Sequence, residues 1–152
     1  MKGVTKARVR TTIGALVLAS SSLLSACLKS TEPQASSLDL NGSWRYTGVQ
    51  TSPPREALIG TLTITRESGT SFQGMLVLDA TNEQTQQIRL LNGSVTGSGS
   101  GSNVIDFDAN VDSPPRRHVG TIVADTITGT WIGSSPNGTT SSGTFRVERE
   151  TR

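Results

Sequence analysis

The stretch NGSWRYTGVQ, residues 41–50, sets the pattern that decides the fold. Trp44 and Tyr46 are separated by one residue, so in an extended strand both side chains point to one face and Arg45 points to the other. The rest of the chain beyond this stretch has no helical stripe of useful length. The stretch therefore predicts a half-buried β-strand over residues 42–50.

The same period-two alternation recurs to the end of the chain, with Gly, Asn, Ser and Pro between the runs. Eight strands are predicted, over residues 42–50, 57–66, 71–79, 86–96, 103–111, 117–124, 127–133 and 142–150. Their connections are too short for long crossovers, so consecutive strands should pair antiparallel. We expect an all-β domain folded as an eight-stranded antiparallel up-and-down barrel, because closure removes exposed sheet edges.

Two alternatives to this arrangement stay open. A β-sandwich of two sheets fits the same number of strands. Asn92-Gly93 is a strong turn signal, and a turn there would split the predicted strand 86–96.

The alternation also assigns a set of side chains to the interior of the barrel. The set is apolar and rich in aromatic residues: Trp44, Tyr46, Leu58, Leu62, Ile64, Phe72, Leu76, Leu78, Ile105, Phe107, Ile122, Trp131, Phe145 and Val147. Glycines of the same parity are Gly60, Gly74, Gly120, Gly129 and Gly143. Since glycine inside a strand marks a bend or a close approach, these positions predict sharply coiled strands.

The start of the chain reads as a targeting segment. Its basic residues are Lys2, Lys6, Arg8 and Arg10, and Ile13–Leu24 is an uncharged, mostly apolar run of 12 residues. That run is too short to span a bilayer, which needs about 20 residues, but it suits a secretory signal. Leu24-Ser25-Ala26-Cys27 then resembles the lipobox of bacterial lipoproteins. The resemblance implies cleavage before Cys27, the only cysteine, with a diacylglycerol on its thiol and an acylated amine.

Three segments follow from this interpretation. Residues 1–26 are a lipoprotein signal peptide, 27–40 are the lipidated Cys27 and a flexible polar tether, and 41–152 are the β-barrel domain. By the same resemblance, Leu28 after the cysteine implies an outer-membrane protein of the bacterial cell envelope, on the periplasmic side or the surface. The expected partner is therefore the membrane, through a lipid anchor.

Removal of the signal changes the charge of the protein. The mature chain would keep 10 basic and 12 acidic side chains, a net charge of −2. It has no basic run longer than Arg116-Arg117, and no aromatic residues are interleaved with that pair, so we expect no nucleic-acid binding. Without a second cysteine there is no disulfide framework, and stability must come from packing.

The two ends of the barrel domain carry a second resemblance. Gly42-Ser43-Trp44 is similar to the Gly-x-Trp of the calycin superfamily, the lipocalins and avidin-like barrels. In that superfamily an Arg or Lys of the last strand lies across this Trp at the closed end. The resemblance implies that Arg149, which shares parity with Phe145 and Val147, covers Trp44 at the barrel floor. The other lipocalin motifs and a biotin site have no match here.

The opposite end of the barrel is where a binding site is expected. Its predicted connections, TSPPREA, ATNEQTQ, DSPPRR and SSPNGTTSS, are long or contain proline, and binding residues are often carried by such loops. The candidate residues at this rim are Arg55, Glu56, Arg116, Arg117 and His118. They form either an anion-attracting rim or ordinary solvated loop charge, the more frequent case. We expect His118 to be a partly exposed strand residue.

Enzymatic chemistry has little support. Asp106 and Asp108 share a face that should point to solvent, one His and no other Cys exclude the common zinc sites, and no nucleophile-elbow motif is present. No catalytic residue, metal or cofactor is expected. Two functions remain: an envelope lipoprotein whose barrel binds a small apolar or amphipathic ligand, or a structural or interaction lipoprotein with a side-chain-filled barrel that contacts another envelope protein.

Overall fold

The computed structural model describes residues 39–100, 103–134 and 138–151. Cys27, the predicted signal peptide and most of the predicted tether lie outside these residues. Within the described ranges, no helix is long and apolar enough to cross a membrane.

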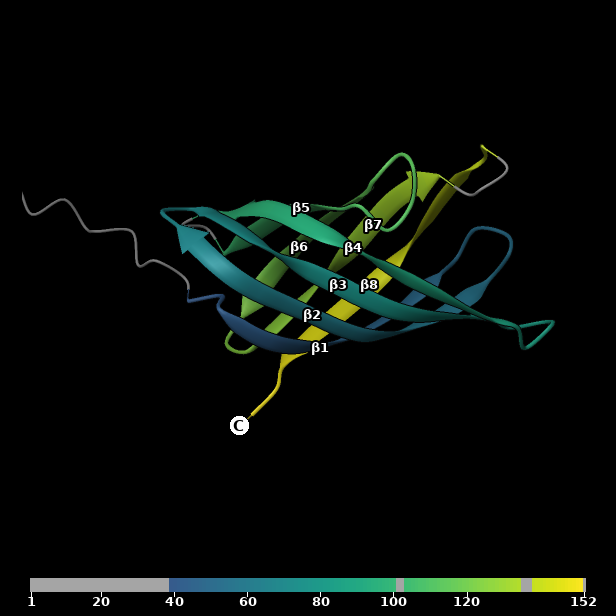
Figure 1. Cartoon of the computed structure of the whole chain (residues 1–152), viewed down its shortest axis with the longest axis horizontal. Helices are drawn as coiled ribbons and strands as arrows, with labels where there is room; N and C mark the ends of the chain where they lie inside the picture. Colours follow the sequence, from purple (N-terminus) through teal and green to yellow (C-terminus); the bar gives the residue numbers. More distant parts are fainter. Residues whose placement is uncertain (1–38, 101–102, 135–137, 152) are drawn as a thin grey trace, which may run out of the picture. The chain divides into compact units, whose positions relative to one another are not determined.

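The described chain is a closed barrel of eight antiparallel strands in sequence order (Figure 1). The strands are β1 (Gly42–Gln50), β2 (Glu56–Ser68), β3 (Ser71–Asn82), β4 (Ile88–Gly99), β5 (Val104–Ala109), β6 (Arg116–Val123), β7 (Thr126–Ser134) and β8 (Thr140–Arg149). Each pairs with the next, and β8 pairs with β1. The predicted all-β barrel is confirmed, and the sandwich is wrong. β4 runs unbroken through Asn92-Gly93, so the turn considered there is also wrong.

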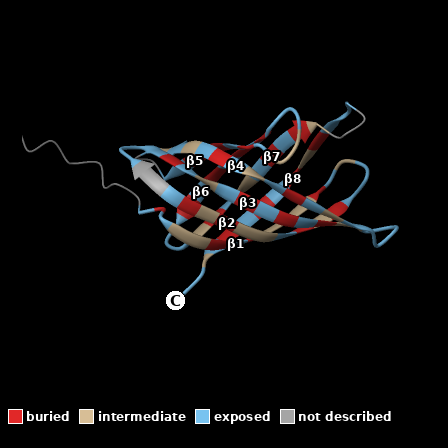
Figure 2. Cartoon of the chain, viewed as in Figure 1, coloured by how far each residue is buried: buried red, intermediate tan, exposed pale blue. Residues whose placement is uncertain are grey.

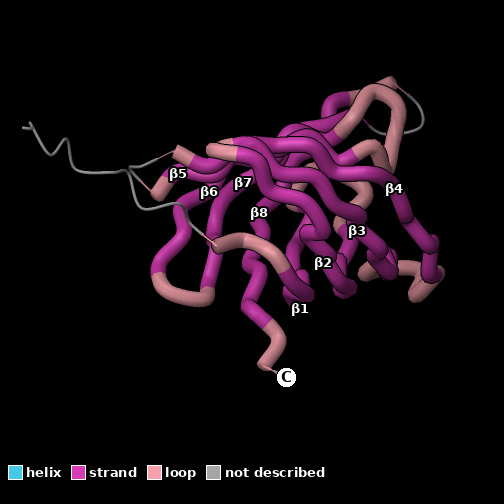
Figure 3. Tube along the Cα trace, turned by 60° about the vertical axis from the view of Figure 1, so that its left-hand side comes forward, coloured by secondary structure: helices cyan, strands magenta, loops and turns pink. Residues whose placement is uncertain are grey.

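The meander gives the barrel two different ends. At one end, which we call the floor end, β1 begins and β8 finishes, with Trp44 opposite Arg149. The turns β2–β3, β4–β5 and β6–β7 lie at this end as well. The other end, the rim end, carries the connections β1–β2, β3–β4, β5–β6 and β7–β8 (Figures 1 and 3).

The interior of the barrel is filled by side chains. Buried and exposed residues alternate along the strands, as Figure 2 shows, and every residue of the predicted inward set is buried. A void large enough for a water molecule would leave solvent-accessible surface on the side chains that line it. Leu58, Leu62 and Leu76 have none, with exposed fractions of 0%. The barrel is therefore packed to close density at these levels.

Two of the inward glycines show why the strands can coil so tightly. A Cβ placed on Gly60 would lie 1.9 Å from the carbonyl oxygen of Val77, and one on Gly129 would lie 2.1 Å from that of Val119. These distances are far below van der Waals contact, so neighbouring backbones approach where a side chain is missing. The predicted close approach at these two positions is confirmed.

Candidate functional site

The floor end is closed by one cation–aromatic pair. The Arg149 guanidinium carbon lies 4.3 Å from the ring centroid of Trp44. The indole Nε1 of Trp44 donates to the carbonyl of Leu40 at 2.9 Å. The contact that the calycin resemblance implies is thus present in the structure, and it comes from register, because Trp44 and Arg149 are directly opposite residues.

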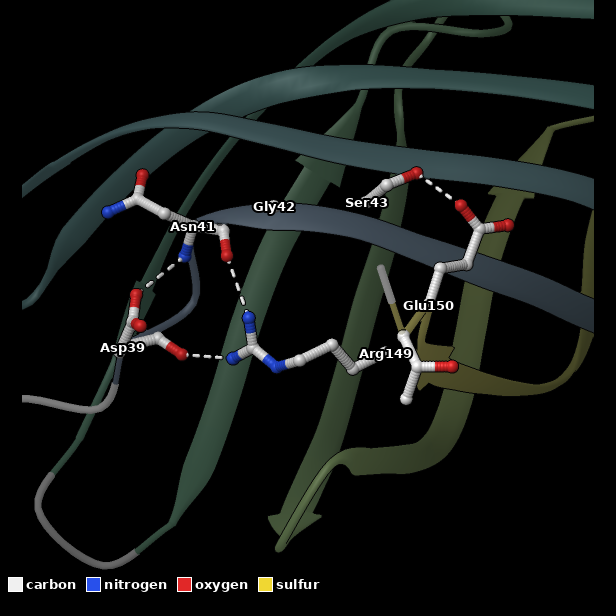
Figure 4. Close-up of a pocket in the computed structure, with 7 residues that line it drawn as sticks. Asp39, Asn41, Gly42, Ser43, Arg149 and Glu150 are labelled. Carbon is white, nitrogen blue, oxygen red and sulfur yellow. Dashed lines mark hydrogen bonds between the residues drawn. The ribbon is translucent and has the colours of Figure 1, made fainter.

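Every guanidinium nitrogen of Arg149 has a partner. Nε bonds the Asp125 carboxylate at 2.9 Å, Nη1 bonds the carbonyl of Asn41 at 2.7 Å, and Nη2 bonds the carbonyl of Asp39. The outer side of this end is an open pocket of about 650 Å³ (Figure 4). Its polar groups bond one another, as Ser43 and Glu150 also do at 2.6 Å. The floor end is therefore built as a structural closure.

The five rim candidates do not form one cluster. Arg55 is exposed and lies 3.5 Å from Glu83. Arg117 points outward and makes two bonds to Asp106, at 3.2 and 2.6 Å, which lower the pKa of that carboxyl. Arg55, on the β1–β2 connection, and Arg117, on the outer face of β6, are therefore solvated charges. The other three candidates, Glu56, Arg116 and His118, are buried inside the barrel.

The prediction that His118 is partly exposed is wrong, since its exposed fraction is 0%. Its ring stacks on Phe107 with centroids 4.4 Å apart. Nδ1 lies 3.1 Å from the carbonyl of Arg116, which can only accept, so Nδ1 carries the proton. Nε2 then accepts from the Tyr46 hydroxyl at 3.2 Å.

Both ring partners of this hydrogen bond stay uncharged. Burial lowers the pKa of His118 to about 3 and raises the pKa of the Tyr46 phenol. A neutral imidazole with both nitrogens engaged is a core residue. Among the described residues, no group of three or more His, Cys, Asp or Glu side chains is placed to hold a metal ion.

A chain of four charged groups crosses the interior at the rim end. Arg89 lies 3.0 Å from Glu56 and 3.4 Å from Asp112, and Asp112 lies 2.6 Å from Nε of Arg116. Ala80 sits opposite Arg89 on β3, and its small side chain leaves the longer one room to cross toward Glu56 on β2. Two carboxylates and two guanidiniums balance, so this network has no formal net charge.

Arg116 forms the second cation–aromatic pair of the barrel. Its guanidinium carbon lies 4.4 Å from the ring centroid of Trp131. Unlike Arg149, it is incompletely satisfied. Three buried polar atoms have no hydrogen-bond partner among the described residues: Nη1 of Arg116, Nε1 of Trp131 and Oγ of Ser141. All three side chains are at most 2% exposed, and all three lie at inward positions on β6, β7 and β8 near the rim end.

The sequence indicates Arg116 as either part of an anion-attracting rim or a solvated loop charge, and Trp131 as a core residue, whereas Ser141 is not among its candidates. A usable signal existed, because Arg116 and His118 share parity with Ile122, which was assigned to the interior. Ser141 likewise shares parity with Phe145. The three atoms together, which we call the rim donor set, are the candidate functional site.

The outer wall offers two further features. An open pocket of about 430 Å³ lies over β4, β5 and β6, lined in part by Thr96, Asp108 and Arg117. Exposed apolar side chains gather on β2, β3 and β4: Ile59, Met75, Val77, Ile88 and Leu90. By register Asp79 lies directly between Ile59 and Leu90, and Val77 is diagonal to both, so these three apolar side chains surround a carboxylate on the outside of the barrel.

No protein-family model matches the chain, and no curated protein matches it. Solved structures do. EF1p2_mFAP2b bound to DFHBI has a TM-score of 0.58 at 14% identity, covering 73% of this chain and 94% of that one. A redesigned β-barrel, mFAP1, bound to DFHBI, has a TM-score of 0.52 at 16% identity, covering 72% and 94%. The S-type phycobiliprotein lyase CPES from Guillardia theta has a TM-score of 0.50 at 9% identity, covering 74% and 89%. At these identities the likeness shows the fold alone, an eight-stranded antiparallel β-barrel.

Proposed function

We propose that this protein is a lipid-anchored lipoprotein of the bacterial cell envelope whose barrel recognises a small amphipathic molecule at its rim end. The observation that carries the proposal is the rim donor set. The packed interior between the ends argues against a ligand held deep in the barrel. The ligand would instead lie against Arg116, Trp131 and Ser141, on the rim side of the contacting rings of Phe107 and Phe145.

The energetic argument compares the two ends. Buried polar groups are nearly always hydrogen-bonded, and one left without a partner costs about 1–3 kcal/mol. At the floor end the fold satisfies all three nitrogens of Arg149. At the rim end three polar atoms have no partner among the residues that the structure describes. A protein retains such a penalty most readily where a bound molecule removes it, as in sites that trade stability for function.

Known proteins with this fold also bind small molecules. Two of the similar structures are bound to DFHBI, and a third is a phycobiliprotein lyase. We propose that this barrel also binds a small molecule, without enzymatic activity. The described chain enters the barrel at the floor end, at Asp39 and Leu40. A tether from Cys27 would therefore leave the rim end facing away from the membrane.

The ligand proposal is tested by native mass spectrometry of the full chain, purified in mild detergent from its own host. We expect a population whose mass exceeds that of the lipidated protein by one small molecule. The Ser141→Ala variant, which removes one member of the rim donor set, should retain less of it. If the wild-type protein carries only its own acylated mass in every growth condition, the ligand proposal is wrong.

The anchor proposal is tested separately with Cys27→Ser. We expect this variant to remain an unprocessed precursor without acyl chains. The wild-type protein should partition into the detergent phase, because each buried CH₂ contributes about 0.8 kcal/mol and two or more chains hold a protein stably. Cleavage of the variant, together with wild-type protein in the aqueous phase, would contradict the anchor.

A second function is favoured by the exposed apolar side chains of Ile59, Val77 and Leu90, which lie around Asp79 on the outer wall. Their exposed fractions are 55%, 40% and 61%, and apolar surface gathered in this way often marks a protein contact. In this alternative the barrel is a structural support and its outer wall contacts another envelope protein. A photocrosslinker at Val77 should then capture one specific partner in intact cells, whereas one at the outward-facing Thr128 on β7 should not.

A further inference from the structure

Resting on the proposed function, we infer that the rim donor set binds an uncharged hydrogen-bond acceptor, a carboxamide or ester carbonyl, in preference to a carboxylate. Arg116 Nη1, Trp131 Nε1 and Ser141 Oγ are the atoms that hold it. The ligand class is therefore a small amphipathic amide or ester, with its carbonyl at the rim end of the interior.

The first step is the chemistry of the three atoms. A guanidinium nitrogen and an indole nitrogen only donate hydrogen bonds, and a serine hydroxyl can donate. None has a partner among the described residues. A molecule that satisfies all three must therefore present acceptor oxygens. An aliphatic amine or another guanidinium would leave Arg116 and Trp131 as they are.

The second step is their placement. Ser141 lies opposite Gly133 on β7, and Trp131 lies opposite Gly143 on β8. A Cβ on Gly143 would be 2.7 Å from Nε1 of Trp131, and one on Gly133 would be 2.8 Å from Cγ of Arg116. The two glycines thus place no side chain between Ser141 and its neighbours. By register Ser141 is diagonal to Trp131, and only Gly133 lies between Ser141 and Arg116, so all three side chains share one inward face of the barrel.

The third step is charge. The network of Glu56, Arg89, Asp112 and Arg116 already balances two negative groups with two positive ones. A carboxylate would add an unbalanced charge to a site whose polar atoms are closed to solvent. Burying such a charge is expensive unless it gains its own counter-ion. A neutral carbonyl supplies the missing acceptor without disturbing this balance.

The fourth step is a consequence for the free protein. Each atom of the rim donor set has almost no exposed surface here, so a ligand reaches it only when the surrounding side chains move. Removing one of these groups removes the free-energy cost of an unpartnered buried atom from the free protein. It also removes a hydrogen bond to the ligand from the complex. Ser141→Ala should therefore weaken binding while leaving thermal stability unchanged or higher. A purely structural serine would behave in the opposite way.

The experiment uses the full chain in mild detergent and two short probes with the same alkyl tail, hexanamide and hexanoate. Isothermal titration calorimetry should give a Kd for hexanamide at least tenfold below that for hexanoate. Ser141→Ala and Trp131→Phe should each raise the hexanamide Kd at least fivefold. Ser142→Ala, on the outward face of the same strand, and Trp44→Phe, at the floor end, are matched controls and should leave that Kd unchanged.

Each outcome has a defined meaning. Equal or tighter binding of hexanoate overturns the preference for a neutral group. Hexanamide binding that is insensitive to Ser141→Ala and Trp131→Phe overturns the assignment of the donors. If neither probe binds while the host-purified protein retains a molecule in native mass spectrometry, this inference fails and the proposed function stands. A fall in the melting temperature of Ser141→Ala shows that the hydroxyl has a partner, and it also overturns the inference.

Discussion

The floor pair gives the sharpest test of the fold, because its two residues join the first and last strands. We consider Trp44→Ala, Arg149→Ala and the double variant. Arg149→Ala removes the stacked guanidinium and its bonds to the carbonyls of Asp39 and Asn41. Trp44→Ala removes a fully buried indole and its bond to the carbonyl of Leu40.

The magnitudes follow from these contacts. Hydrogen bonds from a charged donor contribute about 1.5–3 kcal/mol each, and Arg149 is 26% exposed, so the lower value applies. The cation–π contact contributes about 0.5–2 kcal/mol, and the pair with the exposed Asp125 adds little. Two such bonds at the lower value and the cation–π contact together give about 3.5–5 kcal/mol for Arg149→Ala. A buried Trp→Ala change costs about 3–5 kcal/mol.

Urea unfolding followed by far-UV circular dichroism measures all four proteins of the cycle. The double variant should be less destabilised than the sum of the single ones by about 1 kcal/mol, which is the stacking contact counted twice. Arg146→Ala on the outward face of β8 is the control. Loss of its exposed ion pair with Glu148 should lower the free energy of unfolding by about 0.5 kcal/mol or less. Strict additivity of Trp44→Ala and Arg149→Ala would refute the reasoning.

Two other predictions concern the interior. Because the folded pKa of His118 is about 3, below its ordinary value of 6.5, the unfolded chain binds more protons between these values. The free energy of unfolding should therefore fall as the pH is lowered across this window, by at most about 1.4 kcal/mol per pH unit; urea titrations should show it, and His118→Gln should flatten it. Gly60→Ala should lower the free energy of unfolding by several kcal/mol or prevent folding, because the added Cβ would lie 1.9 Å from the Val77 carbonyl oxygen. A Gly60→Ala protein with wild-type thermal stability would contradict the close approach.

Much of the fold could be predicted from the sequence because a barrel strand obeys one simple rule. The alternation at Trp44 and Tyr46 reports which face is buried, and this rule holds at every predicted inward position. The same alternation assigns Arg116 and His118 to the buried face, because both share parity with Ile122. Their chemical type argued for the opposite placement, since charged and titratable side chains are seldom buried without partners.

The candidate site was harder to predict because its partners are distant in sequence. Arg116 is buried with Asp112 of the β5–β6 connection and, through it, Arg89 of β4. No local pattern indicates that such a network exists. Ser141 carries even less signal, since a serine between polar residues looks like any loop or strand edge. Only the assembled barrel shows that its hydroxyl is buried and has no partner within the described part of the chain.

The contrast between the two arginine–tryptophan pairs has an evolutionary consequence. A library of variants selected only for the amount of folded protein in the cell should hold Trp44 and Arg149 fixed, because loss of either lowers stability. The same selection should let Ser141 drift toward alanine, since nothing in the described structure rewards its hydroxyl. A library selected for growth of the host should instead keep that serine. The position at which the two libraries diverge would identify what the protein is maintained for, even while its ligand is unidentified.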